Sequence, residues 1–242
     1  MQRLMLTLDT PAANIALDEA LLDLAEATGP SAEYLRVWES PRPIVVVGRS
    51  SRVHQEVDEA ACRERSIPVL RRSSGGAAVV AGPGCLMYAV VISYAGRPQL
   101  RDVSLAHAFV LDGIIHGLRE WLPAVEREGT SDLTIGGRKF SGNSLRAKRS
   151  HFLYHGTLLY DFDLPLIATC LRTAPRQPAY RRSRSHEDFV ANLQLAKQEV
   201  EDALRTAWPT SGELGDWPRE RVANLVEERY GLEAWNLAYG RS

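Results

Sequence analysis

The sequence has little of what marks a secreted or membrane-bound protein. Its three cysteines, Cys62, Cys85 and Cys170, are too few and too scattered in 242 residues for a disulfide framework or a zinc site. No run approaches the roughly 18 apolar residues that span a bilayer. Acidic residues interrupt the N-terminal stretch where a signal peptide would be apolar. We therefore expect a soluble protein of the reducing cytoplasm.

An excess of charge of one sign is missing as well. The chain has 29 lysine and arginine residues against 30 aspartate and glutamate residues, a net charge of −1. This balance provides no overall positive field for nucleic acid. The hydrophobic share of 45% is ordinary for a soluble globular protein, and neither an internal repeat nor a low-complexity linker divides the chain. We expect a single domain over residues 1–242, with neither nucleic acid nor a membrane as partner.

The apolar pattern alternates between helical and strand periods. Helices are expected at 14–27, 57–65 and 104–121, the last with an apolar side made by Leu105, Phe109, Ile114, Ile115 and Leu118. Strands are expected at 34–39, 43–48, 67–72, 85–94 and 151–160, and the Gly-Gly pair in "DLTIGGRKFSG" (132–142) is typical of a hairpin. This order predicts an α+β fold with a mixed, largely antiparallel sheet flanked by helices.

A glycine-rich stretch, "RRSSGGAA" at 71–78, lies between two of the expected strands. It lacks the spacing of a Walker loop, GxxxxGK[ST] before a helix, and that of the dinucleotide fingerprint GxGxxG. A strand–loop–strand with exposed backbone N–H groups can still bind an anion, and Arg71 and Arg72 would add charge-assisted hydrogen bonds to phosphate oxygens. A tight structural turn is the other interpretation of the loop alone.

Two further segments carry side chains suited to an anionic substrate. "GTSDLTIGGRKFSGN" contains Asp132 and Lys139 beside the small residues Ser141 and Gly142. A lysine ammonium can approach an anion as a compact point charge, and an aspartate can hold Mg²⁺ against phosphate oxygens. "YHGTLLYDFD" places His155 and Gly156 on a strand with little bulk to exclude a ligand.

Taken together, these segments resemble the lipoate–protein ligase and octanoyltransferase family. The family pattern reads roughly R-R-x-S-G-G-G-A-V, then N/S-D-L…G-x-K-x-x-G, then H-H-G-T-L-L. The matching stretches here are "RRSSGGAAV", "SDLTIGGRKFSG" and "YHGTLL", preceded by "NIALDEALL" and "LRVWESPRPIVVVGR". The resemblance covers about residues 8 to 163, with its motifs in the family's order.

The resemblance implies a catalytic domain of the class II synthetase and biotinyl–lipoyl ligase type, with a tunnel for a medium-chain acyl group. It implies that ATP with Mg²⁺ activates lipoate or octanoate as acyl-AMP. The acyl group then passes to a lysine of a lipoyl domain, as in a 2-oxoacid dehydrogenase E2 or a glycine cleavage H protein. Carried over, Lys139 is the catalytic residue, and Asp132 faces Mg²⁺ or the nucleotide. The residues implied to bind substrate or nucleotide are Arg71, Arg72, Ser74, Gly75, Gly76, Ala77, Ala78, Val79, Asp132, Gly142, His155 and Gly156.

Three departures from the family pattern stand out. Ala77 replaces the third glycine, which is tolerable unless that position needs a positive φ. Ala81-Gly82 replaces the usual His-Asp, and Cys85 the usual Asn. Only about 80 residues follow Asp161, so we expect the separate C-terminal accessory domain of larger ligases to be missing, and a separate accessory subunit is a possible partner.

The distribution of thiols favours ligase over transferase chemistry. Transferases of this superfamily form an acyl-thioester on a cysteine. One branch carries it where this chain has Phe152, the other where it has residues 129–131, and neither place holds a thiol. Cys85 is expected to be buried and inert. The alternatives are an octanoyl-carrier-protein:protein octanoyltransferase and the adenylate-binding half of a split ligase; biotin is excluded because no GRGRxGRxW-like loop is found.

Arginines are concentrated in "RTAPRQPAYRRSRSHEDF", at 172, 176, 181, 182 and 184. The segment is interpreted either as a solvated loop or as a dock that steers an acidic lipoyl domain.

Overall fold

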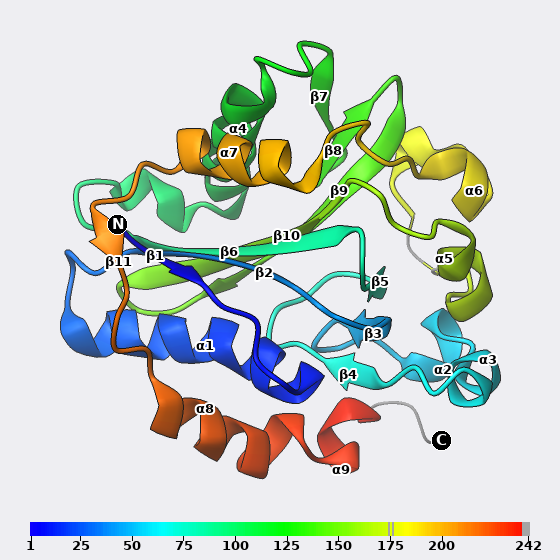
Figure 1. Cartoon of the computed structure of the whole chain (residues 1–242), viewed down its shortest axis with the longest axis horizontal. Coiled ribbons are helices and arrows are strands. Elements are labelled where there is room, and N and C mark those ends of the chain that lie inside the picture. Colours follow the sequence, from blue (N-terminus) through cyan, green and yellow to red (C-terminus); the bar gives the residue numbers. More distant parts are fainter. Residues whose placement is uncertain (174, 176, 239–242) are drawn as a thin grey trace.

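The computed structural model describes residues 1–173, 175 and 177–238, and these form one large and one small sheet with helices around them (Figure 1). The strands are β1 (Gln2–Met5), β2 (Tyr34–Glu39), β3 (Ile44–Val47), β4 (Val69–Arg71), β5 (Val79–Ala81), β6 (Cys85–Ser93), β7 (Val125–Glu128), β8 (Asp132–Ile135), β9 (Arg138–Ala147), β10 (His151–Leu159) and β11 (Gly212–Glu213). The α-helices are α1 (Pro11–Thr28), α2 (Val53–Glu56), α3 (Glu59–Glu64), α4 (Val103–Leu118), α5 (Pro165–Cys170), α6 (His186–Phe189), α7 (Lys197–Ala207), α8 (Arg219–Leu225) and α9 (Glu233–Asn236). Short helical turns of other types are η1 (Pro98–Arg101), η2 (Ala179–Arg181) and η3 (Val226–Tyr230).

The large sheet has eight strands in the order β11-β1-β2-β6-β10-β9-β8-β7. The pairs β11–β1 and β1–β2 are parallel, and every later pair is antiparallel. The small sheet has the order β4-β3-β5, with one parallel and one antiparallel pair. The predicted mixed, largely antiparallel sheet flanked by helices is confirmed.

Strand β6 divides the interior into two hydrophobic layers, because alternate residues of a strand face opposite sides of the sheet. Met87 and Val91 belong to the cluster shared with α1 and the small sheet. Tyr88 and Val90 belong to the cluster shared with α4 and α7. Helices α4 and α7 therefore cover one face of the large sheet, while α1 and the small sheet lie against the other, with α8 beneath α1 (Figure 1).

Local signals explain the elements that carry the site. Helix α1 begins where the Thr10 hydroxyl accepts a hydrogen bond from Ala13 N–H, with Pro11 in the first turn, and it ends at Gly29 with φ 114°. The β8–β9 hairpin turns at Gly136 and Gly137, whose φ values of 56° and 71° require glycine. The predicted Gly-Gly hairpin is thus confirmed. No helix in the described part of the chain has the length and apolar character needed to cross a membrane.

The predicted apolar side of the helix at 104–121 is partly wrong. Leu105 and Phe109 are 49% and 38% exposed, whereas Val110, Leu111 and Ile114 are buried. Helix α4 packs its buried side on the sheet and on α7. Leu105 and Phe109 each directly precede a buried residue in the sequence, so their side chains point away from that side. Phe109 contacts the Trp208 ring instead, with ring centroids 5.7 Å apart.

Candidate active site

Two adjoining cavities open where the small sheet meets strands β8, β9 and β10 of the large one. The α1 cavity extends toward helix α1 and is lined by residues that include Ile15, Asp18, Val46, Arg72, Met87, Asn143, Ser144, His155 and Gly156. The α5 cavity is lined by residues that include Glu56, Val80, Phe140, Leu159, Ile167, Leu171, Arg181, His186, Phe189 and Val190. Both are lined by Ala77, Ala78, Val79, Lys139, Gly142 and Thr157, so Lys139 stands at the junction.

The segment between β4 and β5, residues 72–78, is called the glycine loop here. Within the described part of the chain, the backbone N–H groups of Gly75, Gly76 and Ala77 make no hydrogen bond. Gly76 has a φ of 89°, whereas Ala77 has a negative φ, so alanine is tolerated there. Unpaired consecutive N–H groups of this kind form an anion-binding concavity. The loop therefore supplies donors at the edge of both cavities.

Gly48 supports the glycine loop from behind. A Cβ atom at Gly48 would lie 1.9 Å from the carbonyl oxygen of Gly76, while one at Gly75 would meet no atom within 4 Å. Gly48→Ala is therefore expected to lower the free energy of unfolding by about 1–3 kcal/mol through overpacking, and Gly75→Ala, the matched control, by far less. Urea denaturation of both variants measures the difference. Equal stabilities would show that Gly48 does not support the loop.

Arg71 corrects the prediction that both arginines of the motif face a phosphate. Its side chain is fully buried, and its guanidinium donates to the backbone carbonyls of Gly48, Ser51 and Trp235, among others. These carbonyls lie behind the loop, and among the described residues Arg71 is not part of the lining of either cavity. Arg71 is therefore a structural residue.

Arg72 lines the α1 cavity, but its guanidinium is also engaged by the protein. It donates to the carbonyl oxygens of Val46 at 3.0 Å, Gly75 at 2.6 Å and Ala77 at 3.0 Å. Burial lowers the pKa of Arg72 to about 10, so the group stays charged at neutral pH. These bonds shape the glycine loop, and binding of phosphate by Arg72 stays a prediction.

Lys139 and Asp132, predicted as a pair from sequence, do meet. The Lys139 ammonium lies 2.7 Å from Oδ1 of Asp132, and the Tyr180 hydroxyl donates to Oδ2 at 2.7 Å. Burial and the neighbouring Asp132 carboxylate raise the pKa of Tyr180, which keeps it a donor. Gly142 makes room for the lysine, since a Cβ there would lie 2.9 Å from Nζ. A charged amine is thus held at the cavity junction.

Asp132 was also predicted to face Mg²⁺. Among the described residues, no group of three or more His, Cys, Asp and Glu side chains is arranged to hold a metal ion. A single carboxylate can still share Mg²⁺ with phosphate oxygens and water, as is common for nucleotide-bound Mg²⁺. The donor set therefore fits an ion that arrives with its nucleotide rather than a resident metal.

His155 lies in a chain of four polar residues. The sequence motifs identified His155 and Ser74, but not the other two. Its Nδ1 is 3.1 Å from Oδ2 of Asp18, and its Nε2 is 2.6 Å from the Ser74 hydroxyl. The other Asp18 oxygen accepts from Arg36 at 2.6 Å, and Arg36 is fully buried. With Nδ1–H directed at the carboxylate, Nε2 is left to accept from Ser74. These contacts, called the Arg36–Asp18–His155–Ser74 relay because each residue contacts the next, connect the glycine loop with α1 and β10.

Gly156 is required by its neighbour on β9. A Cβ there would lie 1.7 Å from Oδ1 of Asn143, which accepts from the Tyr88 hydroxyl at 2.5 Å. The amide of Asn143 donates to the Ser131 carbonyl at 2.8 Å and so faces the α1 cavity in a fixed orientation. The sequence pattern identified Gly156 but gave no sign of Tyr88.

Sequence reasoning also missed Glu56 and Asp18. Glu56, on α2, accepts a hydrogen bond from Ala78 N–H at 2.6 Å and lines the α5 cavity. Asp18 carried a usable signal, because a carboxylate in the middle of the apolar stretch "NIALDEALL" needs a buried partner. Glu56 lies in a polar stretch, where nothing distinguishes it from a solvated residue.

The arginine-rich segment is only partly exposed in the described part of the chain. Arg181 is buried and lies over the Phe189 ring, and Arg184 donates to the carbonyls of Gly137 and Tyr180. Arg182 is exposed, while Arg176 lies outside the described residues. Arg181 therefore lines the α5 cavity and Arg184 holds neighbouring backbone, while docking of an acidic lipoyl domain stays a prediction.

His186 completes that wall. Its Nε2 is buried and has no hydrogen-bond partner in the part of the chain that the structure describes. Burial and nearby Arg181 lower the pKa of His186, so the ring is neutral at pH 7. Within the described residues, the α5 cavity thus has an imidazole nitrogen without a partner in a lining that also includes the aromatic rings of Phe140 and Phe189.

Comparison with known proteins now fixes the family. Residues 10–206 match the family model described as the lipoyl protein ligase A/B catalytic domain. The chain belongs to this family. It is 27% identical to lipoate–protein ligase 1 of Staphylococcus aureus, over 96% of this chain and 71% of that protein. It is 26% identical to octanoyltransferase LipM of Kyrpidia tusciae, over 92% of this chain and 93% of that protein.

Solved structures of the lipoyl protein ligase family share the fold. A bipartite lipoate protein ligase from Thermoplasma acidophilum superposes with a TM-score of 0.83 at 21% identity, over 100% of this chain and 97% of that one. A lipoate-protein ligase A bound with ATP gives a TM-score of 0.83 at 21% identity, covering 98% of each chain. The fold and family expected from the sequence motifs are confirmed, and the relatives include both activities that were expected.

Proposed function

We propose that this chain, as a single catalytic domain of residues 1–242, is an ATP-dependent lipoate–protein ligase of the cytoplasm. It activates lipoate or octanoate as acyl-AMP and transfers the acyl group to a lysine of a lipoyl domain. One observation supports this most: Lys139 lines both cavities, and it shares the α1 cavity with Gly76 and Ala77, whose N–H groups make no hydrogen bond within the described residues. Relatives of this chain bear the names of lipoate–protein ligases.

The two cavities suit two different parts of an acyl-adenylate. The α1 cavity extends between α1 and the sheet along Ile15, Val46 and Met87, an apolar lining for an acyl chain. The α5 cavity has aromatic rings and the unpartnered His186 nitrogen, which suit a purine base. The mixed anhydride would then lie at Lys139, where the cavities meet.

In the first step, a carboxylate oxygen of the acid attacks the α-phosphorus of ATP, and pyrophosphate leaves. Lys139 and the glycine-loop N–H groups stabilise the negative charge that develops on the α-phosphate. Asp132 holds the Lys139 ammonium in place. It is also the residue that would hold Mg²⁺, which would help to neutralise the charge of the nucleotide. In the second step, the neutral amine of the acceptor lysine attacks the carbonyl carbon, and AMP leaves with the bonding electron pair.

Transfer from an octanoyl carrier protein is the alternative, favoured by the relatives named octanoyltransferase. It would need a reactive thiol, and Phe152, at one family cysteine position, is fully buried. Cys85 is also buried, and burial raises the pKa of its thiol to about 12. The thiolate nucleophile is therefore scarce at neutral pH.

This burial gives a direct prediction for Cys85. Because a group with a pKa near 12 stays protonated through the neutral range and up to strongly alkaline pH, iodoacetamide at pH 7–8 is expected to leave the activity unchanged. Cys85→Ser should likewise keep acyl-AMP formation within about twofold. Loss of acyl transfer in either experiment, with folding intact by circular dichroism, would favour the thiol-dependent transferase.

Transfer to an apo lipoyl domain distinguishes the three functions. The domain is mixed with the chain and one donor: ATP plus octanoate, preformed octanoyl-AMP, or octanoyl carrier protein. Acylation with the first donor, detected by mass spectrometry, supports the ligase. Acylation from octanoyl-AMP alone would mean that adenylation requires a separate subunit, as in a split ligase, and acylation from the carrier protein alone would establish the transferase.

A further inference from the structure

The last described part of the chain, α8 through α9, lies outside residues 10–206 that match the family model. It runs beneath α1 and ends beside β4, the strand that leads into the glycine loop (Figure 1). Val222, Leu225 and Tyr230 are buried in the cluster shared with α1 and the small sheet. The segment is therefore part of the core and not a surface tail.

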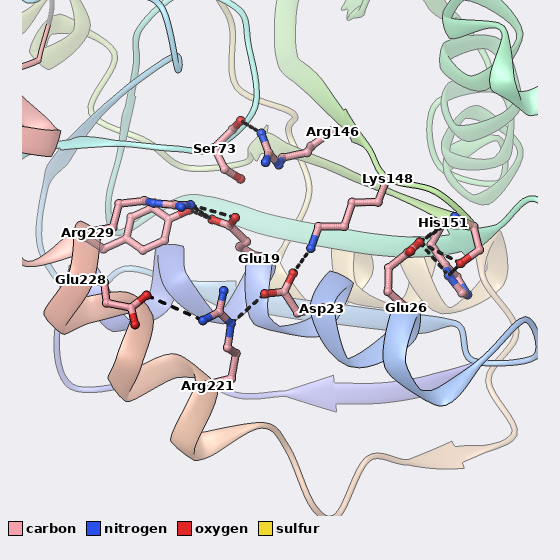
Figure 2. A network of polar contacts seen from close by, with 12 residues as sticks. Glu19, Asp23, Glu26, Ser73, Arg146, Lys148, His151, Arg221, Glu228 and Arg229 are labelled. Carbon is pink, nitrogen blue, oxygen red and sulfur yellow. Dashed lines mark hydrogen bonds and ion pairs between the residues drawn. The ribbon is translucent and has the colours of Figure 1, made fainter.

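Ion pairs fix this segment to α1. Arg221 contacts Asp23 at 2.7 Å, and Arg229 contacts both oxygens of Glu19 at 2.8 and 2.9 Å (Figure 2). The hydroxyl of Tyr230 also donates to Glu19, which is buried. Glu19 adjoins Asp18, the residue that holds His155. The same helix thus connects the C-terminal segment with the relay that reaches Ser74.

A second set of contacts reaches Arg71, the last residue of β4. Strand β4 pairs only with β3, so its other edge needs partners for its backbone. Arg71 N–H donates to Oδ1 of Asn236 at 2.9 Å, and the Trp235 indole N–H donates to the Arg71 carbonyl at 2.9 Å. The Arg71 guanidinium returns a bond to the Trp235 carbonyl at 3.0 Å. Helix α9 therefore completes this edge with side chains instead of a strand.

The Arg71 contacts continue to the glycine loop. The guanidinium also donates to the Gly48 carbonyl at 2.7 Å, and Gly48 packs directly against Gly76. On the other side, the carbonyl of Ser73 accepts from Arg146 of β9 at 3.0 Å (Figure 2). The start of the loop is thus held between β9 and the C-terminal segment.

From these contacts we infer that the C-terminal segment, residues 219–238, sets the position of the anion-binding N–H groups of the glycine loop, with Trp235 and Asn236 as positioning residues. Neither residue lines either cavity. They act through Arg71 and Gly48 on the geometry at Gly75–Ala77. The inference rests on the proposed function in one respect: the anion whose binding is measured below is ATP.

Trp235→Phe tests the inference by removing the indole N–H while keeping an aromatic ring, and Trp217→Phe, just before the segment, is the matched control. Losing the indole donor to Arg71 is expected to weaken ATP binding about fivefold and to leave octanoate binding unchanged. Amide exchange should accelerate at Arg72, whose N–H bonds Val47 at 3.0 Å, and at Ala78. Asn236→Ala, which removes the side-chain oxygen that accepts from Arg71 N–H, should act in the same direction.

Exchange is measured without ligand, so the two proposals can fail separately. If the wild-type chain binds no ATP but exchange accelerates in Trp235→Phe, the proposed function fails and the positioning role stands. If the wild-type chain binds ATP and Trp235→Phe matches Trp217→Phe in affinity and exchange, the positioning role is wrong. Equal weakening of ATP and octanoate binding would also overturn it, since that result indicates general loosening of the fold.

Discussion

Lys139→Ala is expected to lower the rate of acyl-AMP formation by about 10²–10³-fold, the usual effect of removing one preorganised electrostatic contact to a transition state. The Lys139 side chain is only 26% exposed and lines both cavities. No other lysine lines either cavity. The loss should appear mainly in kcat, because the charge that Lys139 opposes develops during the reaction.

Lys197→Ala is the matched control for that experiment. Lys197 forms an ion pair with Glu39 at 2.9 Å, and its side chain is 48% exposed and outside both cavities. Its replacement should change the rate less than twofold. Thermal unfolding of both variants checks that each is folded. If Lys139→Ala kept its rate within a few fold of wild type, Lys139 would not be the catalytic residue.

Asp18→Asn is expected to have the largest effect on stability, about 3–5 kcal/mol of the free energy of unfolding. Arg36 and Asp18 are both buried and lie 2.6 Å apart. Burial lowers the pKa of Arg36, while the Asp18 carboxylate opposes that change. Asparagine would leave the buried guanidinium without its counter-charge, and His155 without a charged acceptor. Urea denaturation followed by circular dichroism measures the loss.

An exposed ion pair gives the comparison for Asp18→Asn. Arg205 and Asp202 pair on α7 with side chains 39% and 43% exposed. Asp202→Asn should change the free energy of unfolding by less than about 1 kcal/mol, since solvent screens such pairs. Similar losses in the two variants would mean that the buried relay contributes no more than a surface contact.

Much of the site could be predicted because its residues lie in short local patterns. The glycine loop, the Gly-Gly hairpin with Asp132 and Lys139, and the His155-Gly156 pair each occupy one continuous stretch. The polarity and the glycine content of each stretch indicate what the backbone must do there. The structure brings all three stretches to the junction of the two cavities.

The rest depends on contacts between residues far apart in sequence. Arg71 was predicted to bind phosphate because it adjoins the glycine loop, but its partners Trp235 and Asn236 are more than 160 positions away. No local pattern reveals that a guanidinium is turned toward the core. The exposure of Leu105 and Phe109 on α4 was not predicted for a related reason. Both fit a helical period, but the side of the helix that is buried depends on how the sheet and α7 pack against it.

Octanoate-dependent exchange of labelled pyrophosphate into ATP tests the central claim most directly, because it reports reversible formation of acyl-AMP by this chain alone. With Mg²⁺ present, we expect exchange when octanoate or lipoate is added, none without an acid, and a large loss in Lys139→Ala. Absence of exchange with both acids, together with acylation of a lipoyl domain by octanoyl carrier protein, would contradict the proposed ligase and establish a transferase.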